Sequence, residues 1–146
     1  MFTLDGVPLL YNGMEVGDAT ESGDPALFDK MPINWQPKER PPLRAIYHEL
    51  IKLRKQLPAF SNSKVIWLKN ADEKNVVTFL REDETEQFLV AVNLSNRPVS
   101  AAVDVAKAGE FQPVKIVGLS EPPASDFPAL YLGGFETRFY RRAISQ

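Results

Sequence analysis

The chain has 146 residues, of which 44% are hydrophobic and 25% are charged, and it contains no cysteine. This composition is that of a globular protein with a hydrophobic core, and it excludes disulfides, thiolate metal sites and cysteine nucleophiles. The formal net charge is −2, from 17 basic and 19 acidic residues. We therefore expect no nucleic-acid partner, which would need a basic surface. We also expect no membrane partner, because no stretch reaches the ~18 consecutive apolar residues of a membrane span.

The first residues, 1–6, lead straight into an apolar segment and lack the basic and long apolar regions of a signal peptide. Because a natural amino terminus is usually polar and mobile, we expect Met1 to be an internal methionine of a longer protein. The compartment stays unassigned.

A short apolar run bounded by glycines covers residues 6–13. Such a run is typical of a buried strand in a parallel sheet, where both faces are covered. Residues 14–40 are rich in Gly, Pro and Asp and predict an irregular loop. Loops of this length are uncommon inside a compact domain and usually carry function or belong to something larger.

Two prolines, Pro41 and Pro42, open a predicted helix over residues 41–57, and Pro58 is expected to end it. Its apolar residues recur at three- and four-residue steps and form one stripe: Leu43, Ile46, Tyr47, Leu50, Leu53 and Leu57. The single histidine, His48, lies off this stripe, so we expect it on the surface. One histidine cannot build a zinc site.

Short β-branched and aromatic runs separated by polar turns make up the rest of the chain. The runs cover residues 65–68, 76–80, 88–92, 99–105, 114–117 and 137–140. Strands at this spacing, with no helix between them, predict an antiparallel Greek-key sandwich of about seven strands. The predicted fold class is α+β, with the sandwich preceded by one amphipathic helix. The expected sandwich core is Val65, Trp67, Val77, Phe79, Phe88, Val90, Val92 and Phe139.

The segment from Gly6 to Gly17 resembles the last barrel strand of the α-amylase family, where a G-x-P-x-x-Y-x-G-x-E-x-G pattern is typical. All six defining positions match: Gly6, Pro8, Tyr11, Gly13, Glu15 and Gly17. The helix running into residues 53–59 resembles the final barrel helix of that family. Residues 79–81 and 88–95 resemble the central hairpin of its carboxy-terminal domain.

The resemblance implies two parts. Residues 1–58 would be a remnant of the last β/α unit of a TIM barrel, with the strand at about 6–13, the loop at 14–40 and the helix at 41–57. Residues 59–146 would be the carboxy-terminal all-β domain. One β/α unit cannot close a barrel of eight strands, so the missing catalytic barrel is the expected partner. The unpaired strand also predicts that the isolated chain either self-associates through residues 1–57 or leaves much of that region irregular.

The resemblance further implies a parent enzyme that is a retaining glycosidase acting on α-glucans such as starch, glycogen or maltooligosaccharides. Such enzymes use two carboxyl groups about 5 Å apart. In the family these lie on earlier barrel strands, which have no counterpart here. No catalytic residue, metal ligand or cofactor is therefore assigned, and no hydrolysis is expected from the chain alone. The β-domain is expected to pack on the barrel and stabilise it.

Four acidic residues follow the predicted strand, where a barrel has its active face: Glu15, Asp18, Glu21 and Asp24. They fit either a solvated turn or contact with substrate or Ca²⁺, although their spacing is not that of an EF-hand. We read Glu15 as a hydrogen-bonding group. The candidate substrate-binding residues, within a complete barrel only, are Glu15, Asp18 and Trp35.

Two other functions remain open. In a free-standing carbohydrate-binding module, Trp35, Trp67 and Tyr131 would stack on the rings of an α-glucan, although the apolar neighbours of Trp67 favour a core position. In a structural or interaction domain, the unpaired strand would recruit a partner. The acidic run at residues 82–86 predicts a solvated hairpin tip that discourages edge pairing.

Overall fold

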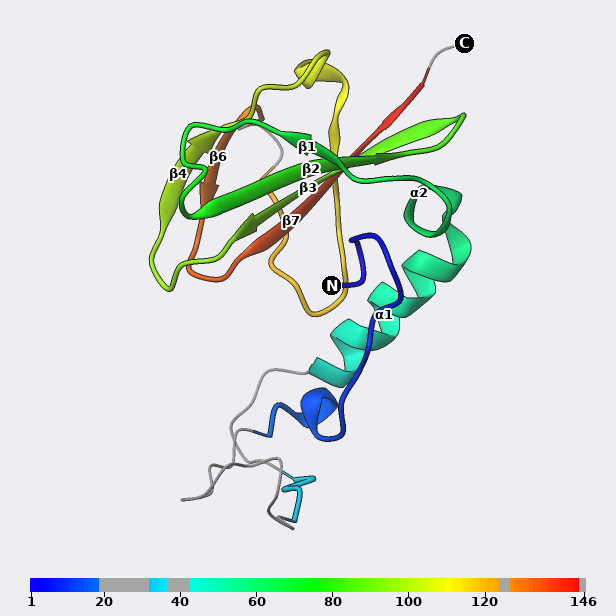
Figure 1. Cartoon of the computed structure of the whole chain (residues 1–146). Coiled ribbons are helices and arrows are strands. Elements are labelled where there is room, and N and C mark those ends of the chain that lie inside the picture. Colours follow the sequence, from blue (N-terminus) through cyan, green and yellow to red (C-terminus); the bar gives the residue numbers. More distant parts are fainter. Residues whose placement is uncertain (19–31, 37–42, 124–126, 145–146) are drawn as a thin grey trace.

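The computed structural model describes residues 1–18, 32–36, 43–123 and 127–144 (Figure 1). Within these ranges, the helical elements are the 3₁₀ turns η1 (Met14–Val16) and η2 (Ala108–Glu110) and the helices α1 (Leu43–Gln56) and α2 (Pro58–Ser61). The strands are β1 (Ile66–Leu68), β2 (Val76–Glu82), β3 (Glu86–Asn93), β4 (Val99–Ala102), β5 (Gln112–Val114), β6 (Ala129–Leu132) and β7 (Thr137–Ala143).

The seven strands in this part of the chain form two antiparallel sheets. The larger sheet has the order β1-β2-β3-β7-β5, and β4 pairs with β6 in the smaller one. From β3 onward every connection crosses from one sheet to the other. The predicted α+β fold with an antiparallel sandwich of about seven strands is therefore confirmed.

The five-stranded sheet is buried on both faces, because successive side chains of a strand point to opposite sides. On one face Leu80, Leu89 and Tyr140 pack against Leu130 and Leu132 of the small sheet. On the other face a second cluster joins the sheet to α2 and α1: Ala59, Phe60, Phe79, Phe88, Val90, Ile116 and Phe139, with Leu50, Leu53 and Leu57 packed against it. The domain thus has three layers, with the five-stranded sheet in the middle.

Helix α1 packs through the stripe that the sequence predicts. Leu50 and Leu53 contact the sheet cluster, and the ring of Tyr47 lies 5.6 Å from that of the buried Phe2. The helix ends at Gln56, and Pro58 occupies the first turn of α2, where its missing N–H costs nothing. The expected end of the helix before Pro58 is therefore confirmed.

Among the described residues, 6–13 belong to no strand and run beside α1, which is the irregular form expected as the alternative to self-association. Two other local expectations were wrong. Trp67 is 64% exposed, and it lies on β1, an edge strand with β2 as its one neighbour in the sheet. Of the run at 114–117, only Val114 lies in a strand, β5 (Gln112–Val114). Strand β6 was not predicted.

Candidate functional site

The predicted site residues Glu15 and Asp18 lie in one tight turn around Gly13. Gly13 has φ 90°, a left-handed conformation that glycine adopts readily. A Glu15 Oε2 oxygen accepts a hydrogen bond from the Gly13 N–H at 3.1 Å, and the Asp18 N–H donates to the Gly13 carbonyl at 2.9 Å. The Glu15 carboxylate therefore helps to close the turn, as a hydrogen-bonding group would.

The stretch 32–36, which carries Trp35, lies against the same turn through Ile33. Ile33 lies so close to Gly13 that a Cβ there would be 3.3 Å from the Ile33 side chain. Trp35 itself is 52% exposed. The turn and the stretch 32–36 are thus brought together, whereas Glu21 and Asp24 lie outside the described residues. Within the described ranges, no three His, Asp or Glu side chains are arranged to hold a metal ion.

The guanidinium of Arg81 on β2 joins three segments of the chain. Its side chain is only 1% exposed, and its nitrogens donate to the carbonyls of Thr3, Ala59, Phe60 and Ser63, and to the Ser63 hydroxyl, at 2.7–3.2 Å. An ion pair of 2.7 Å to Asp5 neutralises it. Burial lowers the pKa of Arg81, and the Asp5 carboxylate opposes that effect. A buried charge is tolerated when it is paired and its donors are satisfied, as here.

A second arginine, Arg54 on α1, binds the same amino-terminal segment. One of its terminal nitrogens donates to the carbonyls of Phe2 and Leu4, each at 2.8 Å, and the other donates to Gly6. Sequence reasoning missed both arginines. The available signal was a charged residue inside an apolar strand, Phe79-Leu80-Arg81, which needs a buried partner to be stable.

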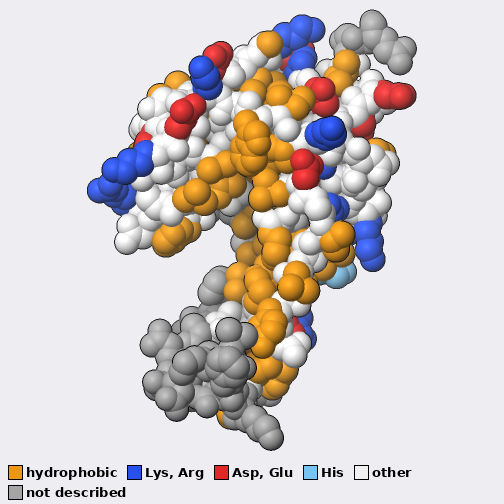
Figure 2. Space-filling model, in the orientation of Figure 1, with side chains coloured by type: hydrophobic (Ala, Val, Ile, Leu, Met, Phe, Trp, Pro, Cys, Tyr) orange, Lys and Arg blue, Asp and Glu red, His pale blue; other side chains and the backbone are white. Residues whose placement is uncertain are grey.

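Beyond the region held by the arginines, the chain exposes large apolar side chains. The exposed fractions are 96% for Val7, 76% for Leu9 and 70% for Tyr11. Next to them lies a groove of about 440 Å³, lined by Val7, Pro8 and Leu10 on one side and Ile51 of α1 on the other. We call residues 7–11 the apolar segment. Figure 2 shows hydrophobic side chains gathered over this part of the molecule.

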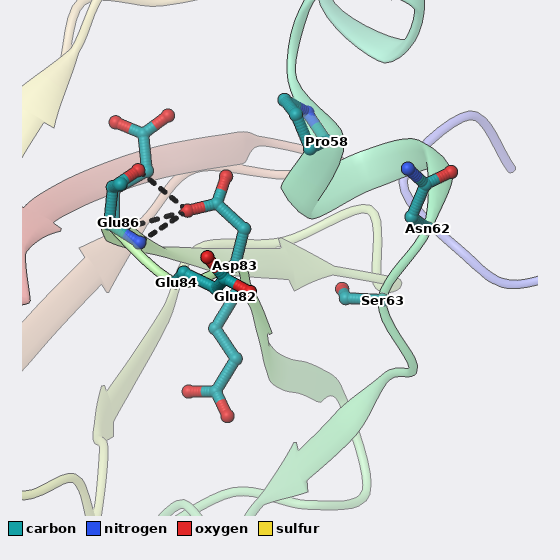
Figure 3. A pocket seen from close by; sticks show the side chains of 8 residues that line it. Pro58, Asn62, Ser63, Glu82, Asp83, Glu84 and Glu86 are labelled. Carbon is teal, nitrogen blue, oxygen red and sulfur yellow. Dashed lines mark hydrogen bonds between the residues drawn. The ribbon is translucent and has the colours of Figure 1, made fainter.

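The acidic run at 82–86 lines an open hollow between the β2–β3 hairpin and α2 (Figure 3). Asp83 Oδ1 accepts from the Thr85 N–H at 2.8 Å and from the Glu86 N–H at 3.0 Å, and the hydrogen bond from Thr85 is the main reason why the pKa of Asp83 is lowered. Glu86 is buried and pairs with Arg141. The run thus forms the expected hairpin tip, with Glu84 and Thr85 exposed, whereas Glu86 is buried in the hairpin.

The three aromatic residues considered for sugar stacking do not share a surface. Trp67 lies on the helix side of the five-stranded sheet, with its ring 5.5 Å from Phe79. Tyr131 is 58% exposed between Leu130 and Leu132, which face the inner core, so it points outward from the small sheet. Trp35 belongs to the stretch beside η1. His48 is on the surface, as expected, with 77% of its side chain exposed.

Comparison with known proteins finds a family and relatives that this chain resembles. The family described as "Maltogenic Amylase, C-terminal domain" matches residues 68–138. The chain is 30% identical over 110 residues to a cyclomaltodextrinase of Geobacillus thermopakistaniensis (strain MAS1), a match that covers 75% of this chain and 18% of the relative. No helix in the described residues is long and apolar enough to cross a membrane.

Two solved structures match almost the whole chain. An α-amylase from H. orenii superposes with a TM-score of 0.68 at 24% identity, covering 97% of this chain and 33% of that one. The maltogenic α-amylase AmyB from Thermotoga neapolitana superposes with a TM-score of 0.64 at 20% identity, covering 99% of this chain and 34% of that one. The chain therefore spans about a third or less of the length of these proteins. The family match, the related cyclomaltodextrinase, the two superposed structures and the motif of residues 6–17 agree. The chain is a carboxy-terminal part of an α-amylase-family glycoside hydrolase.

Proposed function

We propose that this chain is the non-catalytic carboxy-terminal portion of a glycosidase acting on α-glucans, and that it packs on the catalytic barrel and stabilises it. The observation that carries the proposal is the apolar segment beside α1. Val7 and Leu9 are almost fully exposed, although their sequence is that of a strand buried on both faces. Contiguous exposed apolar side chains mark an interaction surface.

The two main apolar clusters of the β-domain are already covered within the chain. Each face of its large sheet already carries a core, one against the small sheet and one against the helices. The incomplete part is the apolar segment, which belongs to no strand; its Tyr11 backbone bonds to Met14, whereas the backbone of residues 7–10 could join a sheet. A parallel strand needs a neighbour on each side, and the barrel of the parent enzyme would supply both.

The carboxylates of the described residues support a non-catalytic role. A retaining glycosidase needs one carboxyl group with a raised pKa to act as the acid, beside a second one about 5 Å away. The richest carboxylate cluster is the hairpin hollow of Figure 3, where the pKa of Asp83 is lowered by hydrogen bonds. Glu86 there is committed to Arg141, and Glu82 to Gln87.

The names of the relatives support α-glucans as the substrate class of the parent enzyme, since they include a cyclomaltodextrinase and a maltogenic amylase. Within that enzyme we place Glu15, Asp18 and Trp35 near the substrate, because the turn around Gly13 follows the segment that would be the last barrel strand. The active face of a barrel lies at the carboxyl ends of its strands.

The test compares Val7→Asp and Leu9→Asp in two settings. In the chain alone, both side chains are exposed, so the melting temperature of the β-domain should not change. In the complete parent enzyme, a buried aspartate should lower the melting temperature by about 5 °C or more, because an unpaired charge is expensive to bury.

Tyr131→Asp is the matched control, because Tyr131 is also exposed but lies on the outer face of the small sheet. It should leave the melting temperature unchanged in both settings. A parent enzyme that tolerates Leu9→Asp as well as it tolerates the control would refute packing of the apolar segment on the barrel.

A further inference from the structure

The carbonyl oxygens of four of the first six residues bind two guanidinium groups. Arg54 takes those of Phe2, Leu4 and Gly6, and Arg81 takes that of Thr3. We infer that Arg54 and Arg81 act together as a clamp, which fixes residues 2–6 and sets the point and direction from which the apolar segment leaves for its partner. The identity of that partner as the barrel rests on the proposed function; the clamp itself does not.

The chemistry of the contacts requires arginine. Hydrogen bonds from a charged donor are stronger than neutral ones, and the planar guanidinium presents several donors in a fixed fork. Arg54 uses both terminal nitrogens to hold three carbonyls within five residues of chain. A lysine ammonium is a point charge on a flexible stem, so it cannot hold three carbonyls in the same arrangement.

Asp5 adds two further links between residues 1–6 and the β-domain. Its Oδ1 accepts from Arg81 at 2.7 Å, and its Oδ2 accepts from the Val65 N–H, just before β1, at 3.2 Å. Residues 1–6 are therefore tied to α1 by Arg54, and to β2 and the start of β1 through Arg81 and Asp5.

The exposure of the chain rises sharply after residue 6, where the clamp ends. Phe2 is 4% exposed and Thr3 is 8% exposed, whereas Val7 is 96% exposed. Gly6 lies at this boundary with φ 83°, a left-handed backbone conformation that glycine adopts readily. The clamp thus separates residues 2–6, which we call the stem, from the exposed apolar segment.

The experiment measures amide hydrogen exchange in the whole 146-residue chain. The reporters are the Leu4 amide, which donates to the Met1 carbonyl, and the Val65 amide, which donates to Asp5. Arg54→Met should accelerate exchange at both by about tenfold or more, because hydrogen bonds from a charged donor are lost. The amide of Val90 in the central strand should stay as protected as before.

Two further variants sharpen the result. Arg54→Lys should lose as much protection as Arg54→Met, since the charge alone does not rebuild the fork. Lys52→Met, at an exposed position of the same helix, should change nothing. Protection of Leu4 within roughly twofold of the unmodified chain in Arg54→Met, or full rescue by lysine, would overturn the clamp.

These outcomes separate the clamp from the proposed function. If the parent enzyme tolerates Leu9→Asp while Arg54→Met still frees the stem, the packing on the barrel fails and the clamp stands. If Leu9→Asp destabilises the parent enzyme while Arg54→Met leaves the stem protected, the packing stands and the clamp fails.

Discussion

Glu136 and Arg138 form a buried pair at the start of β7. Glu136 Oε1 accepts from Arg138 at 2.7 Å, and its Oε2 accepts from the Gly133 N–H at 2.6 Å. Burial alone would raise the pKa of Glu136, but the hydrogen bonds from Arg138 and Gly133 outweigh it, so the pKa is lowered. Here, as at Arg81, a charged side chain fixes a turn of the backbone against the sheet.

The lowered pKa of Glu136 predicts a dependence of stability on pH. A depressed carboxyl pKa stabilises the fold above the unfolded value of about 4.3, and this stabilisation is lost as pH falls through the lower folded pKa. Glu136→Gln should therefore reduce the free energy of unfolding by about 1–3 kcal/mol at pH 7, and the difference should shrink towards about pH 3.

Urea unfolding at the two pH values measures this difference. Glu73→Gln is the control, because Glu73 is exposed, and it should have little effect at either pH. A deficit in Glu136→Gln that stays equally large at low pH would contradict an effect of the ionised carboxylate.

At single positions, the sequence indicates what kind of interaction a side chain makes better than it indicates which residues that side chain contacts. The hydrogen-bonding role expected for Glu15 agrees with its bond to Gly13. The role of Arg81 could not be read from local pattern, because its acceptors lie up to 78 residues away and only the folded chain brings them together. The substrate role of Glu15, Asp18 and Trp35 stays a prediction, since it depends on a barrel outside this chain.

Strands β2 and β3 form the centre of the molecule, and both of their faces are buried. The sequence-based core list selected only one face, that of Phe79, Phe88 and Val90, and omitted the face of Leu80 and Leu89. The continuous apolar runs at 76–80 and 88–92 carried the missing information, because a strand that is buried on both sides does not alternate.

Adjacent residues of β3 should therefore be equally important for stability. Phe88→Ala removes a ring from the cluster under the helices, and Leu89→Ala opens a cavity against the small sheet. We expect each to cost about 2–5 kcal/mol of unfolding free energy in urea titrations. Ser100→Ala, at an exposed position on β4, is the control and should cost little.

A cost below about 1 kcal/mol for either β3 variant would mean that its face of the sheet is not a core. Neighbouring strands also matter elsewhere. β1 has only one, which leaves Trp67 exposed, and residues 6–13 pair with none in the described part of the chain, so their strand-like sequence forms no strand.

At the scale of the whole molecule, a β-domain with a core on each face of its large sheet is joined to the stem, in which Phe2 and Thr3 are buried, and to an exposed apolar segment. The sandwich, the helix and the family could be predicted from sequence, because strand spacing, helical periodicity and the motif at 6–17 are local features. The three-layer arrangement and the clamp could not, because both depend on contacts between distant segments.

The proposed role, support of a glycosidase without its chemistry, is tested by incubating the purified chain with maltoheptaose and measuring new reducing ends. We expect none above the buffer control, because the family resemblance implies catalytic carboxylates on earlier barrel strands, which have no counterpart here. Reducing ends that increase with the concentration of the chain and co-purify with it would contradict this role.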